Sequence, residues 1–232
     1  DVIDAKRIAA FLSLHHSSLK PTIIPRKQIR IIQALLAHRN RLIETKTKFS
    51  VPSGELDFVA DKEISRYVIN TSMKMIKELK VQIKSIENKL NLLIEADIEL
   101  NETYRYLTSV QGVGKVLAWT TLVKTNEFKS INNPRKLACY AGVVPFDYQS
   151  GTSINRSPRV SPMADKTLKK LLHMAAMRAV RIKGELQDYY QRKVNEGKNK
   201  MLVLNAVRNK IVARMCASVN NKKIYQNYLL LS

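Results

Sequence analysis

Apolar residues recur along most of the chain at spacings of three and four, the period of an α-helix with one buried side. The clearest case is residues 55–111, which contain neither Gly nor Pro. Steps of seven, three and four place these apolar residues on one heptad seam: Ile69, Ile76, Leu79, Ile83, Ile86, Leu90 and Leu93, continued by Leu100, Tyr104 and Leu107. The spacing predicts a coiled coil or long helical hairpin over residues 55–107, facing either a second subunit or a helix of its own domain.

Similar periodicity predicts helices over 1–20, 26–49, 133–141, 164–183, 185–197 and 199–221, with breaks at Pro21, Pro25 and "SVPSG" (50–54). In the last of these the pattern places the following residues inside: Leu202, Val203, Ala206, Ile211, Val212 and Met215. The chain of 232 residues has only seven Gly and seven Pro, which favours helices over a strand-and-turn fold. We therefore predict a mainly α protein with three parts, residues 1–50, 55–107 and 108–232.

The charge is strongly basic and unevenly spread. The net charge is +21, from 40 basic and 19 acidic residues, and residues 112–232 hold 22 of the former against 6 of the latter. Such a charge opposes folding by self-repulsion unless a polyanion is near, so nucleic acid is the expected partner. A soluble protein that happens to be basic, or one on an anionic membrane surface, is the alternative. No apolar run reaches 18 residues, so no transmembrane helix is expected.

A glycine turn lies between two expected helices. Gly112 and Gly114 flank Val113, and Lys115 follows. In a helix-hairpin-helix, such a turn lets backbone N–H groups approach a phosphate, which Lys115 would assist. A simple turn between two helices gives the same pattern.

The polar stretch "AGVVPFDYQSGTSINRSPRVSP" (141–162) can hardly pack into a core, and we expect a loop. A serine hydroxyl in such a loop can attack a DNA phosphate and form a covalent phosphoserine. Ser150 precedes a glycine that permits close backbone approach, and Arg156 and Arg159 could clamp a phosphate. An ordinary turn serine is the alternative, and Ser153 and Ser157 are nearby candidates.

Two carboxylates near the start form a second candidate site. Asp1 and Asp4 lie three residues apart and share one face of the expected helix. Carboxylates so placed can bind Mg²⁺, although two seldom suffice. Capping of the helix N-terminus is the alternative role.

The linked motifs resemble the DEDD-type insertion-sequence transposases, a family that includes pilin-gene invertases. The resemblance lies in "LTSVQGVGKVLAWTTLVKTNEFKSINNPRKLACYAGVVPFDYQSG", and it continues into "LKKLLHMAAMRAV" and "YYQRKVNEGKNKMLVLNAVRNKIVARM". The beginning, "DVIDAKRIAAF", resembles the end of the family's RuvC-like domain. It implies that residues 1–50 are the C-terminal remnant of that domain and residues 108–232 the helical transposase domain.

The resemblance implies DNA recombination through a covalent serine–DNA intermediate, with Ser150 as the nucleophile. It implies a Mg²⁺ site of four carboxylates, in which Asp1 and Asp4 match the last two. The first two would precede residue 1, so this chain alone should be inactive. Lys169 stands where the family has arginine, and with Lys170 it is a candidate phosphate contact.

The resemblance also implies a homo-oligomer, dimer or tetramer, which we expect to form through residues 55–107. It further implies a structured guide RNA in some members and a cytoplasmic, nucleoid-associated protein of a bacterium or archaeon. Two alternatives remain: a non-catalytic nucleic-acid-binding module of the helix-hairpin-helix type, and a RuvC-type nuclease in which the serine is structural.

Overall fold

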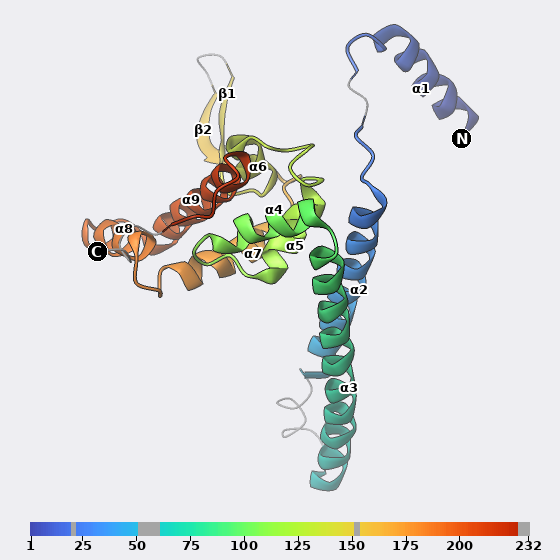
Figure 1. The fold of residues 1–232 in the computed structure, drawn as a ribbon, viewed down its shortest axis with the longest axis vertical. Helices are drawn as coiled ribbons and strands as arrows, with labels where there is room; N and C mark the ends of the chain where they lie inside the picture. The colour runs from blue at the N-terminus through green and yellow to red at the C-terminus, as the bar shows by residue number, and fades with distance from the viewer. Residues whose placement is uncertain (20–21, 51–60, 151–153, 227–232) are drawn as a thin grey trace.

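The computed structural model describes residues 1–19, 22–50, 61–150 and 154–226 of the chain (Figure 1). Most of them are helical, as predicted, and a long pair of helices projects from a body of shorter ones. The projecting pair consists of α2 (Lys27–Ser50) and α3 (Lys62–Glu95). The body contains α4 (Ile98–Ser109), α5 (Lys115–Lys124), α6 (Pro134–Tyr140), α7 (Lys166–Ala179), α8 (Glu185–Asn195) and α9 (Lys200–Asn220).

The two long helices form an antiparallel hairpin. The guanidinium of Arg39 in α2 pairs with the Glu87 carboxylate in α3 at 2.6 Å. Every residue of the predicted seam from Ile69 to Leu93 is at least half-buried, and Leu90 is fully buried. The partner of this seam is therefore α2 of the same chain, which is one of the two arrangements that the heptad spacing allowed.

The helical segment predicted over residues 55–107 has a break at Ala96. Asp97 adopts an extended backbone and its carboxylate accepts a hydrogen bond from the Leu100 N–H, so that it caps the new helix α4. The helical segment predicted over residues 55–107 is thus divided into two helices here, because a capping aspartate begins the second one. Residues 55–60 of that prediction, and the break at 51–54, lie outside the described residues.

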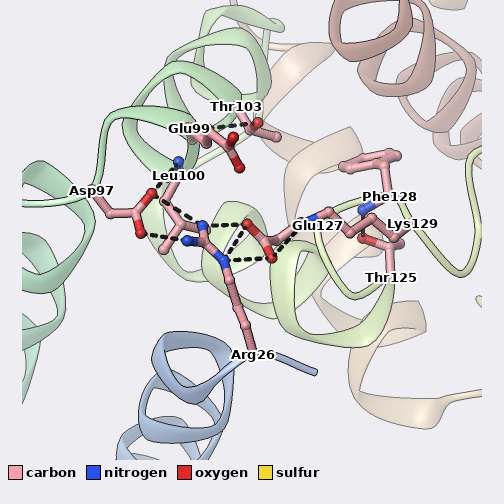
Figure 2. A network of polar contacts seen from close by, with 9 residues as sticks. All are labelled: Arg26, Asp97, Glu99, Leu100, Thr103, Thr125, Glu127, Phe128 and Lys129. Carbon is pink, nitrogen blue, oxygen red and sulfur yellow. Dashed lines mark hydrogen bonds and ion pairs between the residues drawn. The ribbon is translucent and has the colours of Figure 1, made fainter. Parts of the chain in front are cut away.

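A cluster of three charged side chains joins the segment between α3 and α4 to the start of α2 and to the loop after α5 (Figure 2). Arg26, just before α2, donates hydrogen bonds to Asp97 and to Glu127 in the loop after α5. Glu127 lies in a run of three non-glycine residues with positive φ, and the Thr125 hydroxyl accepts the Phe128 N–H at the end of that turn. The strained turn thus places a carboxylate against the guanidinium.

The core of the body surrounds α9, which packs against α4, α6, α7 and α8. Trp119 and Leu122 of α5 and Val207 and Ile211 of α9 are fully buried in it. The first turns of α2 join this core, because Ile29 and Ile32 are also fully buried. The predicted inner side of α9 is correct at Val203, Ile211, Val212 and Met215, but Leu202 is exposed.

The first helix, α1 (Val2–His15), lies apart from the rest and has no buried residue (Figure 1). Its apolar side chains, including Ile8 and Phe11, are exposed in this chain. Within the described ranges, no helix combines the length and apolar composition needed to cross a membrane.

Candidate functional site

The serine-rich stretch forms a β-hairpin rather than the expected loop. Strand β1 (Phe146–Ser150) pairs antiparallel with β2 (Ile154–Arg159), and the hairpin projects from the body (Figure 1). The two strands are joined by pairing of their backbones, which polar residues can form as well as apolar ones.

The register of the hairpin places the candidate nucleophile at its outer end. Ser150 is the last residue of β1 and pairs with Ile154, while Arg156 pairs with Tyr148 and Arg159 with Phe146. Both candidate arginines therefore lie on the strand opposite the serine. Ser153 lies outside the described residues, and Ser157 is within β2.

The hairpin is anchored on rigid elements at its root. Gly142 has a φ of +65°, and a Cβ there would meet the Ala164 Cβ at 2.7 Å, so only glycine fits this turn. The Asp165 N–H donates to the Tyr140 carbonyl at 2.8 Å, which ties the chain leaving the hairpin to the end of α6. The Asn205 side chain of α9 donates to the Val143 carbonyl at 2.9 Å.

A shielded ion pair reinforces the root. Lys124 of α5 contacts Asp165 at 2.7 Å, and Asp165 also caps α7 by accepting the Leu168 N–H. Burial by itself raises the pKa of Asp165, but hydrogen bonds from Lys124 and Leu168 and the lysine charge outweigh it and lower the pKa below its ordinary value. The carboxylate therefore remains ionised and holds α5, α6 and α7 together.

The G-V-G turn joins α4 to α5, as the sequence predicted, but its two glycines differ. Gly112 has a φ of +91°, and a Cβ there would collide with the Ala175 carbonyl of α7. Gly114 has open space around the Cβ position and precedes α5 without a side-chain cap. Gly112 thus serves the packing of the turn on α7, whereas the backbone at Gly114, next to the exposed Lys115, is accessible to a ligand.

The two aspartates of α1 are occupied within their own helix. Asp1 is the N-cap and accepts the Ile3 N–H at 3.1 Å, and Asp4 lies 4.0 Å from the Arg7 guanidinium. Among the described residues, no three His, Cys, Asp or Glu side chains gather in a group that could hold a metal ion. Asp1 and Asp4 by themselves therefore do not fit a magnesium site.

The lysines predicted to contact phosphate line an open groove between α7 and α9. Lys169 and Lys170 lie there with Lys166 and His173 of α7 and with Met201 and Arg208 of α9. Sequence reasoning missed Arg208, because helical periodicity indicates which positions are inside but assigns apolar residues to them. An arginine at the inner position four residues after the buried Leu204 was the available signal.

One of the two cysteines, Cys216, is poorly placed to act as a nucleophile. Cys216 is buried in α9, and burial raises the pKa of its thiol to about 12, so the reactive thiolate is scarce at neutral pH.

Comparison with known proteins found similarity to a transposase family and to pilin gene-inverting proteins. Residues 104–191, which include the G-V-G turn and the whole hairpin, match the model of the family described as "Transposase IS116/IS110/IS902 family". The chain is 24% identical over 187 residues to the "Pilin gene-inverting protein" of Moraxella bovis, covering 80% of this chain and 54% of that protein. The protein of the same name from Moraxella lacunata shows the same identity and coverage.

A third relative comes from an insertion element. The "Insertion element IS110 uncharacterized 43.6 kDa protein" of Streptomyces coelicolor is 25% identical over 203 residues, covering 87% of this chain and 46% of its own length. These similarities support an IS110-type transposase and recombinase family for the matched segment, in agreement with the resemblance. It spans about half the length of the curated relatives it matches.

Proposed function

We propose that the chain is part of a DNA transposase or site-specific recombinase in which Ser150 attacks a DNA phosphate. The observation that carries this proposal is that the family match at residues 104–191 includes the hairpin that ends β1 at Ser150. A serine at the outer end of a hairpin, anchored at its root by α6, α7 and α9, could enter a DNA groove while its base stays fixed.

The proposed step is a displacement at phosphorus. The Ser150 Oγ forms a bond to the phosphorus of a phosphodiester, and the bond from phosphorus to one deoxyribose oxygen breaks. The serine proton passes to a base or to water, and the leaving oxygen takes up a proton. The phosphoserine conserves the phosphodiester bond energy, so that a second deoxyribose hydroxyl can reverse the step and join a new strand.

Cationic side chains would hold the DNA for this step. Arg156 and Arg159 on β2 are the proposed phosphate clamp, since guanidinium groups bind phosphate oxygens in pairs. The Gly114 backbone with Lys115, and Lys169 with Lys170, are the proposed further backbone contacts. A structured guide RNA remains a proposed second partner, supported by the resemblance and the basic charge.

The resemblance also implies Mg²⁺, which would supply a Lewis acid for the phosphate. Because no three His, Cys, Asp or Glu side chains gather among the described residues, these residues alone do not form the site that would hold it. It also follows that this chain by itself should be inactive in strand cleavage.

The decisive variant is Ser150→Ala, made in the reading frame that contains this chain and compared with Ser153→Ala and Ser157→Ala. Each protein is incubated with labelled DNA and Mg²⁺, and protein–DNA adducts are separated on a denaturing gel. We expect Ser150→Ala to abolish the adduct while DNA binding survives, and the two other variants to form it. An adduct of normal yield in Ser150→Ala would contradict the assignment.

A non-catalytic nucleic-acid-binding module is the second candidate. The open backbone at Gly114 and the exposed Lys115 favour it, since they suit phosphate contact without chemistry. It predicts salt-dependent DNA binding but no adduct in any of the proteins above. A RuvC-type nuclease with a structural serine would instead cleave DNA in Ser150→Ala and lose cleavage in Asp1→Asn with Asp4→Asn.

We further propose that residues 1–50, 55–107 and 108–232 have separate roles, with the middle part joining subunits in a dimer or tetramer. Because α2 covers the seam of α3, this contact would use the other sides of α3. Ile64 and Tyr67 near its beginning are exposed apolar side chains on adjacent turns, and Met73 and Val81 follow further along.

A further inference from the structure

The groove between α7 and α9 contains Arg208, a buried arginine without a carboxylate partner among the described residues. The other described arginines that are shielded from solvent each have one. Arg208 is only 7% exposed, yet it makes no hydrogen bond or ion pair with any described residue, and its Nε is fully buried. The other described arginines that are not exposed are Arg26, Arg39 and Arg214. Each of these contacts a carboxylate within 2.7 Å. The most buried of the four is thus the unpaired one.

A buried cation without a counter-charge weakens the fold. Burial lowers the pKa of Arg208, and no carboxylate offsets this effect. A chain that needed only packing at this position would be more stable with an apolar residue of similar volume. The unpaired guanidinium is therefore better explained by a ligand that supplies the negative charge.

The surroundings indicate the charge of that ligand. On α7, Lys166, Lys169, Lys170 and His173 are spaced three and four apart and line the same groove as Arg208. None of the three lysines forms an ion pair with a described residue, and the Nδ1 of His173 is buried without a hydrogen-bond partner. These cations and unsatisfied polar atoms surround the buried guanidinium of Arg208, and such a group of donors fits an oxyanion.

The groove also lies next to the root of the serine hairpin. The Lys169 Cδ lies 3.5 Å from where a Cβ of Gly142 would be, and Asn205, three residues before Arg208, binds the Val143 carbonyl. From Val143 to Ser150 the chain spans at most about 25 Å when extended. A phosphate in the groove could thus belong to the same nucleic acid that meets the hairpin.

We propose that Arg208, with Lys166, Lys169, Lys170 and His173, binds a backbone phosphate of a nucleic acid in the groove between α7 and α9. The guanidinium fork binds two oxygens of the phosphodiester, and the lysines neutralise its neighbours. DNA and RNA present the same phosphodiester, so the test includes both. This inference rests on the proposed function, to which it adds a binding site away from the serine.

The test measures binding and stability together in the 232-residue chain. Arg208→Met is compared with Arg214→Met, which removes an equal charge from the same helix but breaks the ion pair with Glu185. Fluorescence anisotropy follows binding of a labelled 24-bp DNA duplex and a labelled 24-nucleotide RNA hairpin over a series of KCl concentrations. Thermal unfolding without nucleic acid gives the stability of each protein.

We expect Arg208→Met to bind DNA, RNA or both about tenfold or more weakly, with a salt slope smaller by about one. The probe that loses affinity identifies the nucleic acid held in the groove. The same variant should unfold at the wild-type temperature or above, because an unpaired buried charge has been removed. Arg214→Met should bind within about twofold of wild type and unfold at a lower temperature. Equal binding of both probes by Arg208→Met and Arg214→Met would overturn the proposal.

Two double variants test the same proposal if Arg208→Met fails to fold. Lys166→Ala with Lys170→Ala changes two exposed lysines of the groove, and Lys74→Ala with Lys77→Ala changes two exposed lysines of α3. We expect the first pair to weaken binding about tenfold and the second pair less than threefold. Equal losses would overturn the proposal. These outcomes are independent of Ser150, so a failure here leaves the serine chemistry standing, whereas absence of any binding by the wild-type chain would count against the proposed function itself.

Discussion

Arg26 is the side chain whose loss should most weaken the junction between the α2/α3 hairpin and the body. It contacts Asp97 at 2.6 Å and also Glu127, and these carboxylates are only 15% and 6% exposed. Glu127 has one further cation, Lys129, at 3.4 Å. Replacement of Arg26 by methionine would leave two shielded carboxylates with little compensation (Figure 2).

The structure sets the size of the effect. Removal of one partner from a buried ion pair costs about 3–5 kcal/mol. Because Arg26 is itself 30% exposed, water can replace part of its role, and we expect Arg26→Met to lower the free energy of unfolding by about 2–3 kcal/mol. For a chain of this size the melting temperature should fall by about 6–9 °C.

One further variant, with two added substitutions, distinguishes loss of the ion pairs from loss of packing. Adding Asp97→Asn and Glu127→Gln to Arg26→Met removes the unpaired charges, and asparagine at position 97 can still cap α4. We expect this triple variant to recover at least half of the lost stability. The free energies come from urea unfolding followed by circular dichroism.

The pH dependence gives an independent reading. The hydrogen bond from Arg26 lowers the pKa of Asp97, so the folded protein binds fewer protons there than the unfolded chain. This stabilisation is present above the unfolded pKa of about 4 and is lost as the pH falls through the folded value. The difference between wild type and Arg26→Met should therefore shrink below about pH 4. A difference under about 0.5 kcal/mol at pH 7, or a triple variant no more stable than Arg26→Met, would refute the reasoning.

Three other predictions follow from the same contacts. Gly112→Ala should lower the free energy of unfolding by about 3 kcal/mol or more, because its Cβ meets α7, while Gly114→Ala should change it by less than about 1 kcal/mol in urea unfolding. Asp165→Asn, which weakens the pair with Lys124, should lower the melting temperature at pH 7, and this difference from wild type should shrink as the pH falls through the lowered pKa of the wild-type carboxylate. Ile64→Lys with Tyr67→Lys should reduce the mass measured by light scattering if α3 joins subunits, and an unchanged oligomer would exclude this contact.

The spacing of apolar residues predicted the helices well, because a helix that buries one side has apolar residues at regular intervals of three and four. The seam from Ile69 to Leu93 identified the side of α3 that meets another helix, and the actual partner is α2. The seam could not choose between α2 and a second subunit, since both bury the same side. At the break between α3 and α4, Asp97 caps the second helix, and its carboxylate also binds Arg26, which lies 71 residues away in sequence.

The sequence predicted less of the local structure at the candidate site. The hairpin at 146–159 is a product of backbone pairing, which polar residues can form as well as apolar ones. The glycines at 112 and 114 look alike in sequence, and only the approach of α7 distinguishes them. The burial of Arg208 depends on the packing of α7 on α9 and has no counterpart in apolar periodicity.

Identification of the residue that becomes covalently attached to DNA tests the central claim, that Ser150 is the nucleophile, most directly. The protein encoded by the full reading frame is incubated with DNA and Mg²⁺, and the DNA is then digested with nuclease. The protein is digested with a protease, and the peptides are analysed by tandem mass spectrometry. A phosphonucleotide remnant on Ser150, absent from Ser153 and Ser157, is the result that we predict. A remnant on another residue, or an adduct of normal yield in Ser150→Ala, would contradict the assignment of Ser150 as the nucleophile.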